Sequence, residues 1–381
     1  MNPRQERLLS FVRELHRRDQ RGPDAFPIRP SKDSVGIISG RFMSLDSPTT
    51  GDDLVSLKQV EAFKRGLAPQ SSVRPPTPPL AAIQAPLAPA LTEQAADAFS
   101  RALSNKPLSS SDLIHLESIV LPALRPAFDI QNETYDTLPA NWDPFNRQRT
   151  AIEPLIRGIG RLQLTGHPTY TLVGTGFVCG PNAILTNRHV AQIFVQGVES
   201  GQQLSFLPGV SCAMDMLAEV GSASTLRLDL TRPIAVSTLW DVALLRIETL
   251  PDGVTPLPLA GSPPAAISGG FATIIGYPSY DPYESFADQA NIFRAVFDRK
   301  RFQPGKLNGC TDVPSFGRNV SAVAHDCSTL GGNSGSALIS ADIAQVVGIH
   351  FSGITHLSNY AVPTWELVAD PAFAGQSLNF V

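Results

Sequence analysis

One serine in this sequence stands in a setting that suits covalent chemistry. Residues 328 to 340 read STLGGNSGSALIS, so glycines flank Ser334 on both sides and an apolar run follows directly. Glycine permits tight turns that expose backbone N–H groups, and a serine beside such groups can act as a nucleophile next to an oxyanion hole. Many loops share this composition. A serine nucleophile also needs a base, and the base needs an orienting group.

Two residues elsewhere in the chain have the chemistry that Ser334 would require. His189 follows the apolar segment AILTNR, and Asp241 opens the apolar run VALLRI. An unpaired buried carboxylate is too costly, so Asp241 is either exposed at a strand start or buried with a partner. An aspartate that accepts the histidine Nδ1–H holds the ring in the tautomer whose Nε2 can take a serine proton. Each residue alone is a weak signal, whereas the three together indicate a triad.

The elements that would position these residues are short β-rich runs. From Ile159 onward such runs follow one another, separated by Gly, Pro, Asp and Asn, without helical segments between them. This pattern is typical of an antiparallel barrel or sandwich. Residues 251–266, PDGVTPLPLAGSPPAA, read as a connection between two β halves.

The β-rich part of the chain resembles a known family. The matching blocks, in order, are GTGFVCGPNAILTNRHVA, DVALLRI, IIGYP, STLGGNSGSALIS and VVGIHFSG, over about residues 159 to 370. They resemble the chymotrypsin-like (trypsin-like) serine peptidases and, within them, the bacterial glutamyl endopeptidase branch. The resemblance implies a mostly β fold, in which a peptidase domain at 159–381 contains two six-stranded antiparallel β-barrels, at about 159–255 and 266–370.

The resemblance also implies how the site works. Ser334 would attack a peptide carbonyl, His189 would take and return the proton, and Asp241 would stabilise the imidazolium. The backbone N–H groups of Gly332 and Ser334 would form the oxyanion hole. Asn333 stands where the digestive branch has an aspartate that pairs with a freed N-terminal amine, and an amide cannot form that ion pair. We therefore expect a serine endopeptidase that does not use this activation step.

Matched positions also indicate a pocket for an acidic residue before the cut bond. The expected specificity residues are Ser328, Thr329, His350, Ser352 and Gly353. Thr329 and His350 match pocket-lining positions of glutamyl endopeptidases, and a hydroxyl and an imidazole, protonated or oriented as a donor, can bind a carboxylate. Ser328 offers no carboxylate to attract Lys or Arg. For His350 the alternative is a barrel histidine bonded to a neighbouring strand, and His325 is a further candidate outside the matched blocks.

Two other function classes remain open for the same residues. A peptidase-fold binding or scaffold protein would keep the look of a site, although such a copy would usually have lost a triad residue or a glycine. An esterase could use the same triad, but the extended HFSG segment beside the site is suited to pairing with a peptide backbone. The substrate that the sequence favours is therefore a protein or peptide.

The chain ahead of the β-rich part divides into three segments. Residues 1–66 contain two stretches with apolar residues at helical spacing and read as a small α-rich N-terminal domain. Residues 67–90 form a Pro-rich linker, extended because proline fixes φ and removes donors. Residues 91–158 read as a helical lead-in, in which Asp143 is the expected N-cap of a helix and Gly158 lies past its end.

Composition and charge limit the classes of partner that the sequence favours. The 381 residues, 43% of them hydrophobic, are enough to bury a large core. The net charge of only −4 gives no overall field that favours nucleic acid or an anionic membrane. The arginines of the first 21 residues are either a docking surface for a regulatory or recruiting partner or a solvated face.

Other motifs point to neither a cofactor nor export. No zinc-protease, P-loop or dinucleotide-binding motif occurs, so we expect no cofactor and no metal. The charged N-terminus lacks the apolar core of a signal peptide, and no apolar run approaches the length of a membrane span, so we expect a cytoplasmic protein. The four cysteines are then expected to be thiols that fill apolar space.

Overall fold

A computed structural model provides the structure of the chain. It describes residue 101 and residues 126–198, 203–281, 286–354 and 358–381. The N-terminal domain and the Pro-rich linker lie outside these residues, as does most of the lead-in before residue 126. The chain forms two compact units, and among the described residues the larger one contains 127–286 and 296–381. None of the helices within the described ranges has the length and apolar content needed to cross a membrane.

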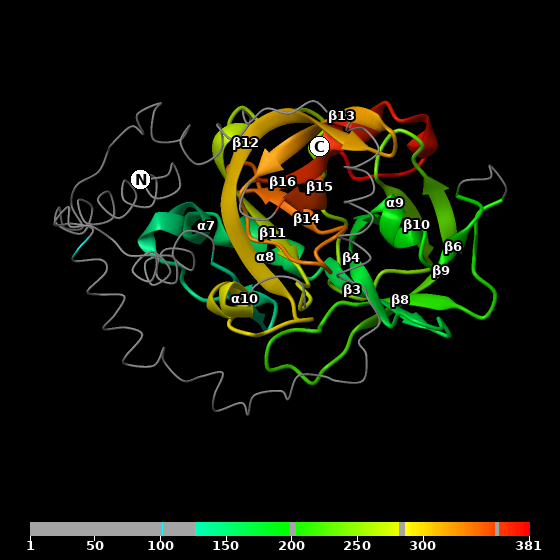
Figure 1. Cartoon of the computed structure of the whole chain (residues 1–381), viewed down its shortest axis with the longest axis horizontal. Helices are drawn as coiled ribbons and strands as arrows, with labels where there is room; N and C mark the ends of the chain where they lie inside the picture. Colours follow the sequence, from blue (N-terminus) through cyan, green and yellow to red (C-terminus); the bar gives the residue numbers. More distant parts are fainter. Residues whose placement is uncertain (1–100, 102–125, 199–202, 282–285, 355–357) are drawn as a thin grey trace. The chain divides into compact units, whose positions relative to one another are not determined.

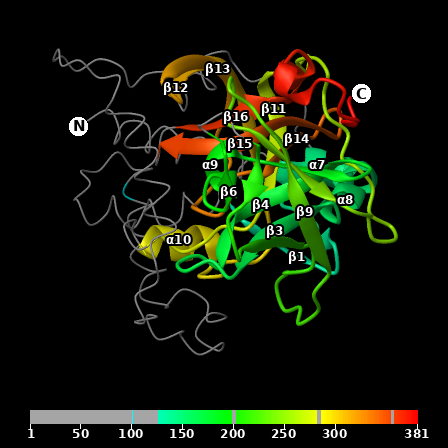
Figure 2. The ribbon, with the colours of Figure 1, turned by 90° about the vertical axis from the view of Figure 1, so that its right-hand side faces the viewer.

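The first part of the larger unit is a closed antiparallel barrel, drawn in green in Figures 1 and 2. Its strands follow the order β10-β5-β4-β3-β8-β9. Their bounds are β3 Ile159–Thr165, β4 Leu172–Gly180, β5 Ala183–Thr186, β8 Ser211–Asp215, β9 Arg227–Val236 and β10 Ala243–Ile247. The interior is filled by buried side chains such as Leu162, Val178, Ile184, Met214 and Leu245. This barrel confirms the prediction for the first β half.

The second part is an eight-stranded sheet with the order β11-β14-β15-β16-β13-β12-β1-β2. Its strands are β1 Phe128–Gln131, β2 Thr134–Tyr135, β11 Ser268–Gly276, β12 Arg301–Ser315, β13 Arg318–His325, β14 Ala337–Ser340, β15 Gln345–Ile354 and β16 Ser358–Pro363. Strand β11 pairs with β12 as well as with β14, so the pairings from β11 to β12 run in a cycle. Ile274, Leu307, Leu338 and Val347 belong to its buried core.

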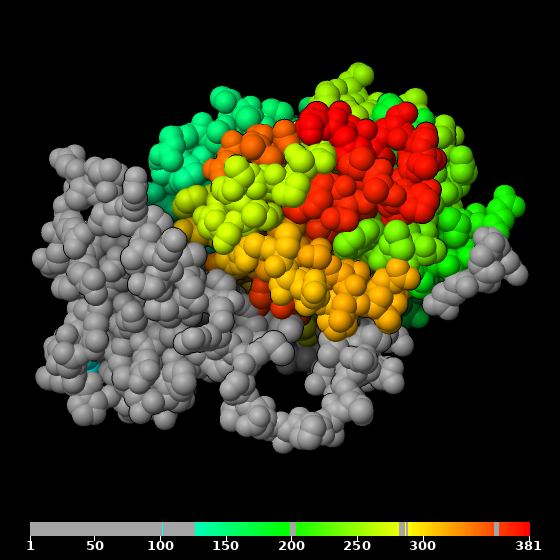
Figure 3. Space-filling view, turned by 90° about the horizontal axis from the view of Figure 1, so that it is seen from above, coloured from blue at the N-terminus to red at the C-terminus, as the bar shows by residue number. Residues whose placement is uncertain are grey.

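The described part of the chain also contains smaller elements. They are η1 Ala140–Trp142, α7 Asp143–Arg147, α8 Arg149–Ile156, α9 Arg188–Ala191, β6 Val195–Gln196, β7 Ser205–Phe206, α10 Phe286–Phe293, η2 Thr364–Val368 and η3 Pro371–Phe373. The last residues, in red in Figure 3, lie at the surface of the larger unit. The Asn379 N–H donates to Cys179 of β4 at 2.7 Å, and the Asn379 carbonyl accepts from Leu259 at 2.8 Å. The C-terminal segment therefore links the barrel to the connection that follows it.

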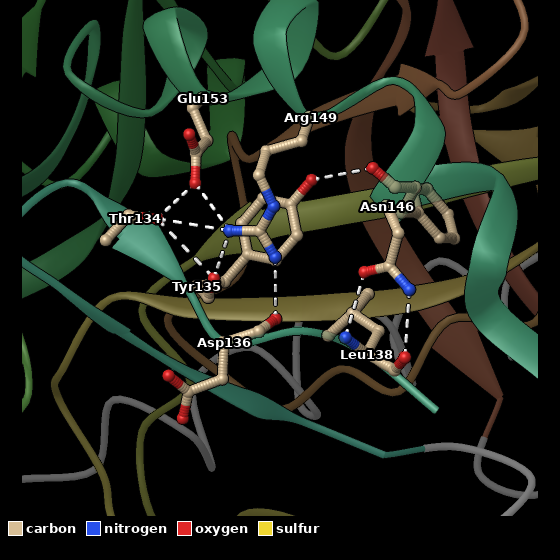
Figure 4. Close-up of polar contacts among 8 residues, drawn as sticks. Thr134, Tyr135, Asp136, Leu138, Asn146, Arg149 and Glu153 are labelled. Carbon is tan, nitrogen blue, oxygen red and sulfur yellow. Dashed lines mark hydrogen bonds and ion pairs between the residues drawn. The ribbon is translucent and has the colours of Figure 1, made fainter. Parts of the chain in front are cut away.

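The described part of the lead-in packs into the core of the larger unit. Strand β1 pairs with β12, and the Tyr135 ring stacks on Phe302 of β12 at 4.3 Å between centroids. Phe145 of α7 contacts the same ring edge-on at 5.2 Å. Strands β1 and β2 form a hairpin. Figure 4 shows how Arg149 of α8 binds the chain just after β2: it donates to the Asp136 carbonyl at 2.9 Å and pairs with Glu153 at 2.7 Å.

One helix boundary in this lead-in differs from the prediction. Asp143 is the first residue of α7 rather than its N-cap, which is Trp142 without a side-chain capping bond. The Asp143 carboxylate instead pairs with Arg147, one turn along the helix. The expected single helix is divided into α7 and α8 at Gln148, whose backbone has left the helical region at φ −95° and ψ 10°.

Candidate active site

Strand pairing brings His189 and Asp241 together. Thr186 at the end of β5 lies opposite Ala243 at the start of β10, so the residues just beyond these positions are neighbours. His189 Nδ1 lies 2.5 Å from Asp241 Oδ2, and the His189 backbone N–H donates to Oδ1 at 2.9 Å. Asp241 is buried, and its carbonyl accepts from the Asn187 side chain at 2.9 Å. The contact between His189 Nδ1 and the Asp241 carboxylate favours the His189 tautomer that carries its proton on Nδ1 and presents Nε2 as an acceptor.

A buried serine and a second carboxylate fix the loop that presents Asp241. Ser237 Oγ accepts from the backbone N–H groups of Leu239 at 3.0 Å and Trp240 at 2.9 Å. The same hydroxyl donates to Asp370, next to η3 in the C-terminal part of the chain. Asp370 lies far from the matched sequence motifs, so the sequence carried no signal for this contact.

The turn that carries Ser334 is hydrogen-bonded on two sides. On the barrel side, Thr175 of β4 donates its backbone N–H to the Ser334 carbonyl at 2.9 Å and its hydroxyl to the Gly332 carbonyl at 2.7 Å. On the sheet side, the Gly335 N–H donates to the His350 carbonyl of β15 at 2.9 Å. The turn thus joins the sheet to the barrel.

The glycines of this turn meet a steric requirement. Gly332 has φ +72° and Gly335 has φ +86°, both in the left-handed region that glycine favours. A Cβ at Gly332 would lie 2.3 Å from the Tyr277 carbonyl oxygen, and one at Gly335 would lie 2.1 Å from the Thr175 carbonyl oxygen. The pattern GGNSG in the sequence therefore reflects the close approach of this turn to its neighbours.

Thr175 is hydrogen-bonded both to the serine turn and to the strand that leads to His189. Its carbonyl accepts the Thr186 hydroxyl at 2.8 Å, so β4 and β5 are tied at this point. Thr186 ends β5 three positions before His189, and Ser334 is bonded to Thr175 itself. Ser334 is 9% exposed and Asp241 is 3% exposed, so the serine and the carboxylate are both largely shielded from bulk water.

Two of the five expected pocket residues, Thr329 and Gly353, lie against Asn359, a residue that the sequence did not indicate. The Thr329 hydroxyl donates to Asn359 Oδ1 at 2.9 Å, and Asn359 Nδ2 donates to the Cys327 carbonyl at 2.6 Å. Gly353 faces the same amide, because a Cβ there would lie 1.9 Å from Asn359 Oδ1. Ser328 is buried. Asn359 lies on β16, and only the pairing of β15 with β16 places it here.

His350 and His325 are buried next to each other. His325 Nε2 lies 3.3 Å from His350 Nδ1, and Ser352 lies opposite Tyr360 in the pairing of β15 with β16. Burial, and then the neighbouring His189, lower the pKa of His350 to about 3, although a hydrogen bond with the Tyr360 backbone acts in the opposite direction. The ring is therefore neutral near pH 7. Of the two forms expected for His350, the protonated one is disfavoured by this environment, and the neutral donor remains.

Comparison with known proteins finds a similar domain and a similar relative. Residues 174–349 match the family model of the trypsin-like peptidase domain. A probable serine protease of Lysobacter enzymogenes is 29% identical over 241 residues, which are 56% of this chain. The chain spans 62% of that relative's length. Residues 174–349 are thus similar to a trypsin-like peptidase domain, as the sequence predicts.

Solved structures of proteases are also similar to this chain. The Rv3671c protease of M. tuberculosis in its active form has 18% identity and a TM-score of 0.43, and the match covers 65% of this chain and 95% of the other. Deg5 has 18% identity and a TM-score of 0.42, with 61% and 94% covered. The HtrA-type protease AlgW with a decapeptide has 14% identity and a TM-score of 0.40, with 58% and 65% covered.

Proposed function

We propose that the protein is a serine endopeptidase in which Ser334, His189 and Asp241 form the triad. The observation that carries this proposal is the contact of His189 Nδ1 with the Asp241 carboxylate at 2.5 Å. It is supported by the Ser334 turn, which is bonded to the same barrel through Thr175. A base held in one tautomer beside a buried carboxylate, with a serine presented from a glycine turn, has the parts that acyl transfer requires.

The proposed reaction has two steps. In the first, Ser334 Oγ bonds to the substrate carbonyl carbon, His189 takes the serine proton and gives it to the leaving amine, and the C–N bond breaks. In the second, water attacks the acyl carbon and His189 takes the water proton; the ester bond to Ser334 Oγ then breaks, the acid product leaves, and His189 returns the proton to Ser334. The N–H groups of Gly332 and Ser334 would donate to the oxyanion, a contribution of about 3–4 kcal/mol per donor in comparable sites.

We further infer that the second sheet closes into a barrel. The cycle of pairings from β11 through β14, β15, β16, β13 and β12 supports this inference. His189 and Asp241 would then come from the first barrel and Ser334 from the second. This arrangement agrees with the hydrogen bond that crosses from Thr175 of β4 to the serine turn.

We also propose a preference for Glu or Asp before the cut bond. The neutral His350 and the second N–H of the Asn359 amide, which Thr329 holds through its hydroxyl, are uncharged groups that can donate to a carboxylate, and a bound carboxylate would favour protonation of the ring. Scoring cleavage of a peptide library at the residue before the cut tests the preference. Equal cleavage after Glu, Gln and Leu, or a His350→Ala variant that keeps its preference, would overturn the pocket without touching the triad.

The activity is tested by comparing the wild type with Ser334→Ala. We expect Ser334→Ala and His189→Ala each to lower peptide hydrolysis by about 10⁴-fold or more, with the double variant hardly worse because the residues act as a unit. Ser268 is an exposed serine of β11, so the Ser268→Ala variant is the matched control and should retain full activity. Simple esters tested beside the peptides separate an esterase from a peptidase. Unchanged hydrolysis in Ser334→Ala would overturn Ser334 as the nucleophile, and a wild type that hydrolyses no peptide would favour the binding role.

A further inference from the structure

A buried pair of side-chain amides lies directly behind the serine turn. Gln303 of β12 donates from Nε2 to Asn333 Oδ1 at 3.1 Å, and Asn333 donates from Nδ2 to Gln303 Oε1 at 3.2 Å. Both side chains are fully buried. Two reciprocal bonds define a distance and an orientation, so a strand of the sheet holds the residue that precedes Ser334.

The surroundings leave Asn333 little freedom to turn elsewhere. Gly276 at the end of β11 makes room for it, since a Cβ there would lie 2.6 Å from Asn333 Oδ1 and 2.0 Å from Ser336 Oγ. The Asn333 N–H is also bonded within the turn, to the Gly331 carbonyl at 2.7 Å. A buried amide that loses its partner keeps an unsatisfied donor and acceptor, so removing Gln303 would destabilise this position of Asn333.

The position of Asn333 matters for the chemistry because this residue lies between the two residues whose N–H groups are the expected oxyanion donors. Gly332 N–H lies on one side of this residue and Ser334 N–H on the other. Donors stabilise a developing charge only when they already point at it, and small misplacements lower rates strongly. We propose that Gln303 is a positioning residue, which orients these two N–H groups by holding Asn333. This inference rests on the proposed peptidase function.

The pair also has an electrostatic consequence. An amide pair carries no net charge and does not titrate. The turn is thus held by neutral bonds from Gln303 and Thr175, and its arrangement does not depend on a charged amino terminus. We therefore infer that the site reaches its active arrangement without a cleavage that frees such a terminus.

The test compares Gln303→Ala with the wild type and with Ser340→Ala. Ser340 is a buried residue of β14 in the same sheet and has no place in the proposed site, so its variant is the matched control. The measurements are kcat and KM on a peptide that the wild type cuts, the rate at which a fluorophosphonate labels Ser334, and the thermal unfolding midpoint. We expect Gln303→Ala to lower kcat and the labelling rate about 10²-fold with KM changed less than about threefold, as for loss of an oxyanion donor.

A second variant, Gln303→Glu, gives a signature that a purely structural role would not. A protonated glutamic acid reproduces both bonds, because its O–H donates to Asn333 Oδ1 and its carbonyl accepts from Nδ2. The ionised carboxylate has only acceptors and repels Oδ1. Activity of Gln303→Glu should therefore fall as pH rises, while the wild type shows no such loss and circular dichroism shows both folded.

The outcomes separate the two levels of inference. Gln303→Ala with kcat within about threefold of the wild type overturns the positioning role, as does a Gln303→Glu variant with the wild-type pH profile. If Gln303→Ala does not fold, the profile of Gln303→Glu decides. A wild-type protein that neither cuts peptides nor labels at Ser334 overturns the proposed function instead.

Discussion

At His350, burial determines the charge that the residue can carry. Its pKa is lowered to about 3, first by burial and then by the positive charge that His189 can carry. An exposed histidine would gain a proton near pH 6.5. His350 therefore stays neutral in the folded protein over a pH range in which the unfolded chain becomes charged.

This difference predicts that acid destabilises the protein through His350. Between pH 6.5 and about 3 the unfolded chain binds a proton that the folded chain does not, so stability falls as pH falls, by at most about 1.4 kcal/mol per pH unit. His350→Gln removes this contribution. Denaturant unfolding of both proteins at pH 7.5 and pH 5 measures it. Equal acid sensitivity of wild type and variant would contradict the lowered pKa.

Residues that define a motif are visible in a sequence, but their partners are often not. The sequence predicts His189, Asp241 and Ser334 as site residues because glycine, apolar runs and chain order surround them with a recognisable pattern. Asn359 and Gln303 carry no such pattern, since each reaches the site only through long-range strand pairing. The neutral state of His350 was equally hidden, because burial is a property of the fold.

At the scale of elements, one buried lysine connects the lead-in to the β structure. Lys300, just before β12, donates to the Ile156 carbonyl of α8 at 3.0 Å and to the Met216 carbonyl at 2.7 Å. Its Nζ lies 3.7 Å from the Glu219 carboxylate, and both side chains are buried. The other oxygen of Glu219 accepts from the Glu133 N–H of the β1–β2 hairpin at 3.0 Å. The pair thus joins three segments that are distant in the sequence.

Breaking this pair should destabilise the fold strongly. Lys300→Met leaves the Glu219 carboxylate buried without its counter-charge, and we expect a loss of about 3–5 kcal/mol in the free energy of unfolding. The double variant Lys300→Met/Glu219→Gln should recover part of this loss, since no uncompensated charge remains. Urea unfolding of the three proteins gives the comparison. A double variant that is less stable than Lys300→Met would count against the ion pair.

Lys300 also predicts an alkaline effect of known sign. Burial lowers its pKa from 10.5 to about 8, so between these values the unfolded chain holds a proton that the folded chain has released. The contribution of Lys300 to stability therefore rises with pH over this window. The free energy of unfolding of the wild type minus that of Lys300→Met/Glu219→Gln, measured at each pH, separates this effect from the titration of other groups. A difference that stays constant between pH 7.5 and 9.5 would refute the lowered pKa.

Secondary structure was predicted best where the pattern repeats. The short β-rich runs after residue 159, separated by Gly, Pro, Asp and Asn, predict the β half that the structure shows as a closed barrel, because such runs and separators are a local signal. The helix start at Asp143 was less accessible to prediction. Local capping preference favours aspartate before the helix, but here the preceding turn is a 3-10 helix that ends at Trp142, which packs edge-on against Phe271 at 6.0 Å. Tertiary packing outweighed the local preference.

At the scale of the whole molecule, the lead-in bears on where the folding unit begins. Residues 127–158 contribute Ile130, Tyr135, Phe145, Ile152 and Ile156 to the same buried core as the β structure. We expect a chain that starts at residue 127 to unfold cooperatively. A chain that starts at residue 159 should lack a stable fold, because core residues that pack against the lead-in, such as Phe302, would be exposed. Thermal unfolding by near-UV circular dichroism distinguishes them. A stable fold from residue 159 would support the boundary predicted from the sequence.

The linker that the sequence predicts at residues 67–90 leads to a further expectation for the full chain. Extended backbone without hydrogen bonds is what proteases bind, so limited digestion should first release a fragment that begins between about residues 66 and 110. Mass spectrometry of the first products locates the cut. A first cut inside residues 160–370 would place the domain boundary elsewhere.

The contact between Ser237 and Asp370 has a consequence for how the protein is made. Synthesis proceeds from the N-terminus, and residue 370 leaves the ribosome long after the barrel residues that include His189 and Asp241. The loop that presents Asp241 therefore gains this contact only when almost all of the described chain has emerged. A nascent chain with Ser334 already outside the ribosome still lacks this contact, so the bond that holds the Asp241 loop forms after the serine turn has emerged.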